Sequence, residues 1–399
     1  MTAITVANIV MRDVDPPIIK AAQVPEGEYL IDTRPDRRDG SRPADVVPDP
    51  EPAPQGVIFQ DGFDDQPDWH SGLPENNTGA FPVNGDGPDR IQRQGTHTVP
   101  VGWDSVYQDP RWAPSMGHPD RHETIEILAA NSGIARGGTG KCFVQRRDSS
   151  DLNGWSWWSD GQLLKLLQPG YSGVYVEFYI AFSPNWTITP SEASSKIFRV
   201  GSWGGEGSEF TAFGGGNQGP LFLWDWKRDN YGVRNLHTRR GGPHGENYVL
   251  STQQSGSYPQ NSMNYTDHIF GMGKGGANPI LADKLNGGPL PTSGIIEHTQ
   301  VFGPPGTYTK IGFYVQTNSA PGAADGIVRQ WIDDVQMMNI TDIMWVPSLP
   351  AGVTEMPKWN FFSIGGNDFF HLYPDSDRRQ EWWAADDVLV RDSIPEALL

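Results

Sequence analysis

Residues 171–203 read YSGVYVEFYIAFSPNWTITPSEASSKIFRVGSW, and the first half of this stretch alternates between apolar and mixed side chains. Apolar residues take every second position from Val174 to Phe182. β-Branched and aromatic residues at a period of two are typical of a β-strand with one face in a core. The other face carries Tyr175, Glu177 and Tyr179, which favours a sugar-binding surface. The plain alternative is a sheet face of amphipathic tyrosines.

Three later segments alternate in the same way: SSKIFRVGSW (194–203), TKIGFYVQTN (309–318) and GIVRQWI (326–332). The 47 glycines and 34 prolines favour many turns and few long helices. Sheets with one apolar face pack against each other in pairs. The sequence therefore predicts an all-β fold, an antiparallel β-sandwich over residues 58–399 with long loops, and one short helix after Asp160.

The side of these strands opposite the core is predicted to form one concave, glycan-binding face. Apolar residues at one parity occupy the core, so the other parity shares the second face. In residues 194–203 that second parity holds Ile197, Arg199 and Trp203. The residues predicted to bind sugar are Tyr175, Glu177, Trp203, Arg329 and Trp331, and those with side chains suited to catalysis are Tyr179, Arg199, His237, Tyr314 and Gln316.

Composition excludes several classes of function. The 399-residue chain has a net charge of −18, whereas binding to nucleic acid needs a basic surface. No apolar stretch reaches the length that spans a membrane. The single cysteine, Cys142, excludes an intramolecular disulfide. The first residues, MTAITVANIVMRDVDPP, do not match a secretory signal, so we expect a location on a virion or an extracellular surface reached without one.

Residues 1–57 differ from the rest of the chain in composition. They contain nine prolines, mixed charges and one aromatic residue, Tyr29. Such a segment buries too little apolar surface to order itself, and it resembles an extended linker. We expect an N-terminal arm that docks onto other subunits of an assembly; the alternative is a disordered tail.

An acidic run begins the globular part, within VIFQDGFDDQPDW (57–69). Clustered carboxylates repel one another unless they are solvated or bind a cation, and hard oxygen ligands suit calcium. First and last strands of jelly rolls commonly lie together, so carboxylates from both ends of the chain could meet. We expect a structural Ca²⁺ near Asp61 and Asp64, with Asp386 or Asp387 from the last strand, and no organic cofactor. A solvated acidic turn is the alternative.

Two other patterns are weak. His118 and His122 lie four residues apart in HPDRH, but the proline between them favours a turn over a zinc-binding helix. The segment RGGTGKC (136–142) lacks the spacing of a phosphate-binding loop, so a nucleotide site is rejected.

Several segments together resemble the concanavalin A-like jelly roll, and more narrowly its polysaccharide lyase-like branch. They are VYVEFYIAFSPNW (174–186), SKIFRV (195–200), GFYVQTNSAPGAADGIVRQWIDD (312–334), FFSIGGND (361–368) and AADDVLV (384–390). The resemblance covers roughly residues 57–395. It implies two antiparallel sheets, a glycan groove on the concave one, and sugar polymers, often uronate-containing, as ligands.

The motifs that would assign catalysis are missing. The E-x-D-x-x-E of glucanase relatives is absent, and so are the Q-I-H and R-x-E-x-R segments of alginate-lyase relatives. β-Elimination needs a cation or amide to neutralise the uronate and a Tyr or His to move protons, which the candidate catalytic residues could supply.

Three hypotheses follow from the sequence. The first is a glycan-recognising component of a larger assembly, most plausibly a phage virion protein docked by its arm. The second is an active polysaccharide lyase that cleaves uronate-containing polysaccharide. The third is a purely structural virion protein.

Overall fold

The computed structural model describes residues 10–12, 30–32, 56–70, 99–108, 124–148, 155–184, 186, 193–205, 209–210, 218–229, 232–242, 248–249, 262–264, 268–269, 277–278, 298–371 and 380–399. Strands dominate this part of the chain, and its helices are short: α3 (His298–Phe302), η4 (Ala129–Asn131) and η7 (Glu396–Leu398). No helix within these ranges is both long and apolar enough to cross a membrane.

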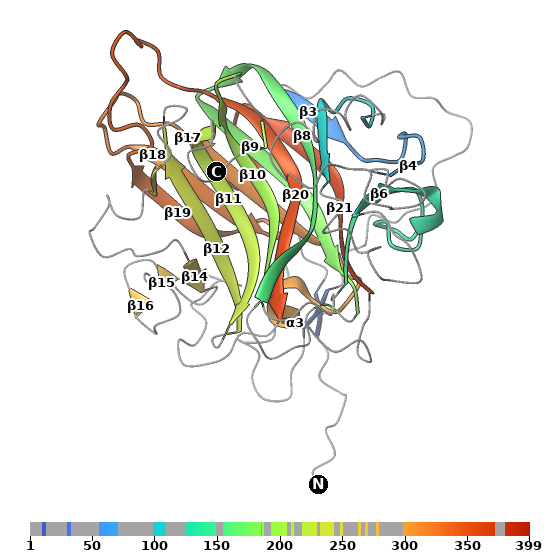
Figure 1. Ribbon diagram of the computed structural model, residues 1–399. Coiled ribbons are helices and arrows are strands. Elements are labelled where there is room, and N and C mark those ends of the chain that lie inside the picture. The colour runs from blue at the N-terminus through green and yellow to red at the C-terminus, as the bar shows by residue number, and fades with distance from the viewer. Residues whose placement is uncertain are drawn as a thin grey trace.

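A nine-stranded sheet forms one layer of the molecule (Figure 1). Its strands follow the order β19–β18–β17–β9–β21–β7–β6–β4, and β3 also pairs with β21. Their bounds are β19 Val335–Ile343, β18 Gly326–Ile332, β17 Thr309–Gln316, β9 Gly173–Phe182, β21 Gln380–Arg391, β7 Phe143–Asp148, β6 Ile125–Ile127, β4 Trp69–His70 and β3 Val57–Asp61.

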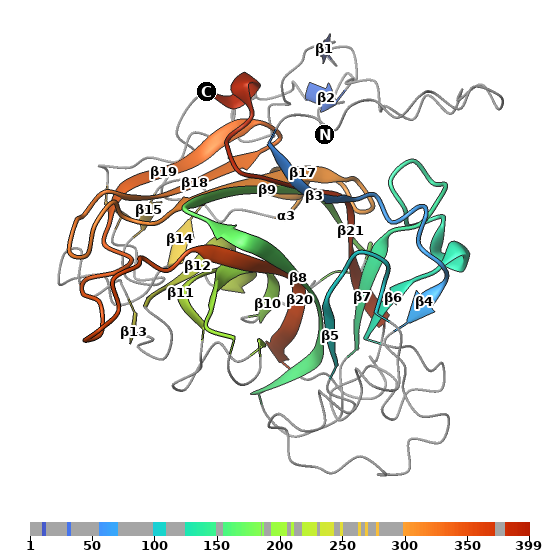
Figure 2. The same ribbon diagram turned by 90° about the horizontal axis from the view of Figure 1, so that it is seen from above.

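An eight-stranded sheet forms the second layer, and Figure 2 shows the nine-stranded sheet arching over it. Its order is β13–β12–β11–β10–β20–β8–β5, with β14 also paired to β12. The bounds are β13 Tyr248–Val249, β12 Gly232–Gly241, β11 Gln218–Asp229, β10 Ala193–Trp203, β20 Trp359–His371, β8 Trp155–Tyr171, β5 Ser105–Gln108 and β14 Ser262–Asn264.

The connections between the layers are those of a jelly roll. The chain changes sheet at each step from β7 to β10 and again from β19 to β21. Strand β3, near the start, pairs antiparallel with the last strand, β21. All strand pairs in the two main sheets are antiparallel. The predicted antiparallel β-sandwich is therefore confirmed.

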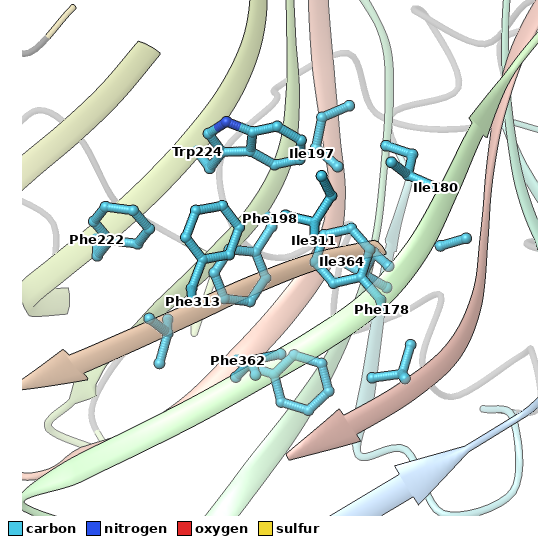
Figure 3. Close-up of a cluster of buried hydrophobic side chains, with 14 of the residues drawn as sticks. Phe178, Ile180, Ile197, Phe198, Phe222, Trp224, Ile311, Phe313, Phe362 and Ile364 are labelled. Carbon is cyan, nitrogen blue, oxygen red and sulfur yellow. The ribbon is translucent and has the colours of Figure 1, made fainter. Parts of the chain in front are cut away.

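The core between the sheets comes from the apolar parity of the alternating strands. From the nine-stranded sheet, Phe178 and Phe313 point inward, and the ring of Phe313 stacks on Phe198 of the other sheet with centroids 5.1 Å apart (Figure 3). Trp224 packs on the same ring from β11. Burying such aromatic side chains contributes roughly 2–3 kcal/mol each, before the entropy cost of ordering them.

Two local predictions were wrong. The expected helix after Asp160 is part of the long strand β8, whose leucines lie on both sides of the sheet: Leu163 and Leu167 enter the core, and Leu164 packs in an apolar cluster on the outer side. Ile197 was expected on the polar side of β10. A bulge between Lys196 and Phe198 turns Ile197 into the core instead.

Two pairs of short strands are not hydrogen-bonded to either of the two main sheets. Strands β1 (Val10–Arg12) and β2 (Leu30–Asp32), from the N-terminal arm, form a parallel pair, and β15 (His268–Ile269) pairs with β16 (Ala277–Asn278). The first strand of the sandwich, β3, begins at Val57, and the division into an arm over residues 1–57 and a sandwich over residues 58–399 stays a prediction. The docking role of the arm stays a prediction, and His118 and His122 lie outside the described residues.

Candidate functional site

The predicted site residues do not share one face. Those on β9, β17 and β18 belong to the nine-stranded sheet: Tyr175, Glu177, Tyr179, Tyr314, Gln316, Arg329 and Trp331. Arg199 and Trp203 lie on β10, and His237 on β12, in the eight-stranded sheet. The prediction of a single face was wrong because alternation assigns a side within one strand and carries no information about which sheet the strand joins.

On the outer face of the nine-stranded sheet, Tyr175 and Trp331 are buried. Their exposed fractions are 0% and 2%, and their rings meet edge to face with centroids 5.8 Å apart. The Tyr175 hydroxyl donates a 2.6 Å hydrogen bond to Glu177 Oε2. Burial raises the pKa of Tyr175, and the nearby charge of Glu177 raises it further. Neither ring is presented for stacking on a sugar.

The ionisable groups on this face pair with one another. Lys310 Nζ lies 3.2 Å from Glu177 Oε2 and 3.0 Å from Asp334 Oδ1. Burial acts to lower the pKa of Lys310, but the carboxylates of Glu177 and Asp334 outweigh it, and the net shift is upward. Tyr179 lies under the guanidinium of Arg136, with Cζ 4.0 Å from the ring centroid.

Arg136 also joins this face to the last strand. Its side chain forms an ion pair with Asp387, and its backbone N–H donates to Asp386 Oδ2 at 2.9 Å. Burial raises the pKa of Asp386 to about 7, and the charge of neighbouring Asp387 adds to the shift. Asp387 has φ of 47°, a left-handed conformation at the bulge where β21 changes register against β9.

The carboxylates expected to hold calcium have protein partners. Asp61 accepts hydrogen bonds from Phe63 N, Gln66 Nε2 and Trp103 Nε1, each 2.7 Å long. Asp64 accepts one from Lys141 N at 2.8 Å. Within the described ranges, no three or more His, Cys, Asp or Glu side chains gather as a metal site would require. The calcium site near Asp61, Asp64, Asp386 and Asp387 stays a prediction.

The remaining residues predicted on this sheet also have partners. The Tyr314 hydroxyl donates to Gln316 Oε1 at 2.8 Å, and Arg329 Nε donates to Asn339 Oδ1 at 2.9 Å. Both contacts join groups on the same face. The predicted residues on the outer face of the nine-stranded sheet are therefore bonded to one another or to neighbouring protein groups.

The outer face of the eight-stranded sheet has a different character around Arg199. Strand pairing places Arg199 between Ser363 of β20 and Leu223 of β11, and the row continues through Leu164 of β8 to Ser105 of β5. Arg199 is 4% exposed, and its Nη1 donates to the backbone oxygen of Phe210 at 3.1 Å. A buried guanidinium thus lies in a row that alternates between serine and leucine.

Ser363 is the direct neighbour of Arg199 and is fully buried. Its hydroxyl makes no hydrogen bond to any group in the described part of the chain. A buried polar group without a partner costs about 1–3 kcal/mol, and such groups call for an explanation. A ligand atom bound beside Arg199 would provide the missing partner.

An apolar cluster borders Arg199 on this face. It is separate from the main core and consists of Tyr107, Leu164, Phe210, Leu221 and Phe361, with Leu166 and Trp203 packed against it. The rings of Tyr107 and Phe210 lie 5.6 Å apart and are tilted by 34°. Of the residues predicted to bind sugar, Trp203 alone belongs to this cluster.

Other polar side chains share this face with Arg199. In the strand register, Tyr107 of β5 lies opposite Gln162 of β8, and Lys196 of β10 lies opposite Asp225 of β11. Lys196 Nζ donates to Asn367 Oδ1 at 2.7 Å. His237 does not share this parity: the register places it opposite the core residue Trp224, and its neighbour Thr238 continues the row of Arg199.

Sequence reasoning missed Tyr107, Gln162 and Ser363. Ser363 and Gln162 each occupy the parity opposite a core residue, Phe362 or Leu163, so the alternation of β20 and β8 contained the signal. Tyr107 lies on a four-residue strand, too short for its alternation to stand out.

The fold is a jelly-roll sandwich, and its eight-stranded sheet presents a guanidinium, an amide, a phenol and apolar side chains on one outer face. No protein-family model matches the chain, and no curated protein matches it.

Solved structures similar to this chain include two alginate lyases and a carbohydrate recognition domain. The alginate lyase Aly36B mutant in complex with alginate tetrasaccharide has 13% identity and a TM-score of 0.38, with 74% of this chain and 87% of that chain covered. The alginate lyase vAL-1 from Chlorella virus has 10% identity and a TM-score of 0.33, with coverages of 63% and 84%. The Emp46p carbohydrate recognition domain has 10% identity and a TM-score of 0.29, with coverages of 63% and 89%.

These proteins are of the kinds to which the sequence resemblance pointed. At TM-scores of 0.29 to 0.38 the similarity carries no argument about the site, and the fold assignment rests on the sheet topology described above.

Proposed function

We propose that this protein binds an acidic polysaccharide on the outer face of its eight-stranded sheet. One observation carries the proposal. Buried Arg199 lies directly beside Ser363 in the strand register, and the buried hydroxyl of Ser363 has no hydrogen-bond partner in the described chain. A guanidinium among apolar neighbours makes strong charge-assisted hydrogen bonds to a carboxylate, because water competes little there. A uronate ring also has an apolar face, which suits the partly exposed Trp203 and, once Phe210 is displaced from it, the buried ring of Tyr107.

The net charge of −18 bears on how such binding should depend on salt. An acidic protein repels a polyanion at long range, so binding must come from local contacts. We therefore expect binding that depends on the carboxylate itself and that tolerates salt better than binding to a basic surface patch does.

The experiment is a binding assay of the full-length protein against a panel of neutral and acidic polysaccharides. The matched control is each acidic polymer after chemical reduction of its carboxyl groups to alcohols, which keeps the backbone and removes the charge. Binding to at least one acidic polymer and loss of that binding after reduction supports the proposal. Equal binding to both forms, or binding to none of the acidic polymers, contradicts it.

A β-elimination lyase is the second candidate, favoured by the side chains that share this face. Arg199 and Gln162 could neutralise a uronate carboxylate, and the Tyr107 hydroxyl could move the proton. Phe210 contacts both Arg199 and Tyr107, so the two side chains reach a common space. Tyr179 and Tyr314, the tyrosines first expected in this role, lie on the other sheet and cannot act together with Arg199.

The lyase is tested by following the unsaturated product while wild type and Tyr107→Phe act on the polymers that bind. A lyase forms product, and loss of the phenol abolishes product formation while most binding remains. A protein that only binds forms no product in either case.

We further propose that residues 1–57 dock the sandwich onto other subunits of a phage particle, at a virion or extracellular surface. The support is their Pro-rich, mixed-charge composition. Deletion of residues 1–55, which ends before β3, is expected to leave the thermal midpoint nearly unchanged and to abolish co-assembly. A large loss of stability would instead place the arm in the core. If no polysaccharide binds and the arm still docks, the purely structural virion role takes precedence.

A further inference from the structure

Phe210 lies outside the strands of both sheets, yet it is 5% exposed on the outer face of the eight-stranded sheet. It makes two different contacts there. Its backbone oxygen accepts the 3.1 Å hydrogen bond from Arg199 Nη1, and its ring packs on Tyr107 with centroids 5.6 Å apart. One residue thus supplies an acceptor oxygen to the guanidinium and a flat apolar group to the phenol ring.

These two contacts are those that an acidic sugar would make. A uronate carries acceptor oxygens on its carboxylate and an apolar face on its pyranose ring. The geometry points to Phe210 as an internal occupant of the site: its carbonyl holds the position of the ligand carboxylate, and its ring holds the position of the sugar ring. This inference rests on the proposed function and adds to it a residue that sets affinity and selectivity.

Displacement of Phe210 must then precede or accompany binding. Only the fraction of molecules with Phe210 displaced is competent, and the apparent Kd rises by the inverse of that fraction. A ligand compensates for the displaced contacts only when it replaces both. A small carboxylate such as acetate replaces the hydrogen bond alone, because it has no ring to pack on Tyr107. The site therefore selects uronate-containing oligosaccharides over free small anions.

Accessibility of Arg199 provides a test that needs no sugar. The full-length protein is treated with phenylglyoxal, which modifies accessible arginines, and the rate at Arg199 is followed by peptide mass spectrometry in wild type, Phe210→Ala and Phe210→Leu. We expect the rate at Arg199 to be lowest in wild type, intermediate in the leucine variant and highest in the alanine variant, with about a tenfold difference between the extremes.

Arg329, on the outer face of the other sheet, is the internal reference in the same digests. Its rate should be equal in all three proteins. Equal rates at Arg199 in wild type and in both variants overturn the inference. A rise at Arg199 and Arg329 together reports general unfolding of the variant. The leucine variant then decides, because a rise confined to Arg199 in that protein supports the inference and its absence overturns it.

Binding of trisaccharides from alginate and from polygalacturonate is then measured by calorimetry, with acetate as competitor. We expect Phe210→Ala to bind one of them about tenfold more tightly than wild type, and acetate to compete better in this variant. Higher accessibility of Arg199 in the variants without any sugar binding supports Phe210 as the internal occupant and overturns the proposed function. Tighter sugar binding without any change in the accessibility of Arg199 supports the proposed function and overturns the role of Phe210 as the internal occupant.

Discussion

The two outer faces of this sandwich carry similar residue types and use them differently. On the nine-stranded sheet, Glu177, Lys310 and Asp334 form one chain of ion pairs, and Arg136 joins Asp387 in another. On the eight-stranded sheet, Arg199 lies between Leu223 and Ser363, and the hydroxyl of Ser363 has no partner in the described chain. On the first face these charges are paired with one another, whereas on the second the buried hydroxyl of Ser363 has no partner in the described chain.

This difference teaches that an accumulation of ionisable and aromatic residues does not by itself mark a binding face. A buried charge is tolerated only when hydrogen bonds or counter-charges satisfy it, so structural networks attract the same residue types as functional sites. What separates Arg199 from these networks is its neighbour Ser363, whose buried hydroxyl has no partner in the described chain. The predictions below test whether the first face stabilises the fold and the second binds.

The largest expected effect is on the stability of the nine-stranded sheet. On its outer face, buried Arg146 pairs with Glu126 at 3.1 Å, and Asn131 contacts both side chains. Arg146→Met removes the cation that pairs with the buried carboxylate of Glu126, which costs about 3–5 kcal/mol. Urea denaturation of the variant should show a correspondingly lower free energy of unfolding.

The control is the double variant Arg146→Met with Glu126→Gln, which removes both charges. It should recover most of the lost stability, because no charge is left buried alone. A single variant within about 0.5 kcal/mol of wild type would show that this network does not stabilise the fold.

The second effect concerns pH and Asp386. Its pKa of about 7 in the folded protein lies above its ordinary value of 3.8. Between these values the folded state holds a proton that the unfolded state has lost. Stability from this group is therefore present below about pH 4 and is lost as the pH rises through about 7, by at most about 1.4 kcal/mol per pH unit.

Asp386→Asn removes this dependence. Relative to wild type, the variant should gain free energy of unfolding as the pH rises from 4 to 8, measured by urea denaturation at each pH. The pH profile of Asp386→Asn is compared with that of Asp387→Asn, which removes the neighbouring charge and keeps the carboxyl group of Asp386. Parallel pH profiles of wild type and Asp386→Asn would contradict the raised pKa.

The smallest expected effect separates stability from binding on the eight-stranded sheet. Ser363→Ala removes a buried hydroxyl that has no partner in the described chain, so the fold should become more stable by about 1 kcal/mol. Binding of an acidic oligosaccharide should weaken about fivefold, since one hydrogen bond to the ligand is lost. Ser105→Ala, in the same row of the sheet, is the matched control. If Ser363→Ala lowers stability and leaves binding unchanged, the hydroxyl belongs to the fold and not to the site.

The strands that alternate over many residues could be predicted from the sequence, and with them the sandwich. Val174 to Phe182 fills the core side of β9 as its pattern predicts. The site could be predicted only in part. Arg199 was identified, but its neighbours come from β5, β8 and β20, and sheet order depends on long-range pairing that no local pattern encodes.

Two local features of the fold also could not be predicted from the sequence. The doubly apolar pattern around Leu163 and Leu164 fits a helix as well as a strand covered on both sides, and tertiary packing decided between them. The bulge at Ile197 depends on the register against both neighbouring strands, so it appears only when the sheet is complete.

The central claim is that the ligand binds at Arg199 and not on the nine-stranded sheet. The most direct test compares Arg199→Gln with Arg329→Gln, one arginine from each outer face, by calorimetry with the acidic oligosaccharide that wild type binds best. We predict that Arg199→Gln weakens binding about 100-fold, because two charge-assisted hydrogen bonds are lost, and that Arg329→Gln stays within about twofold of wild type. Unchanged binding by Arg199→Gln, or a larger loss in Arg329→Gln, would contradict the assignment.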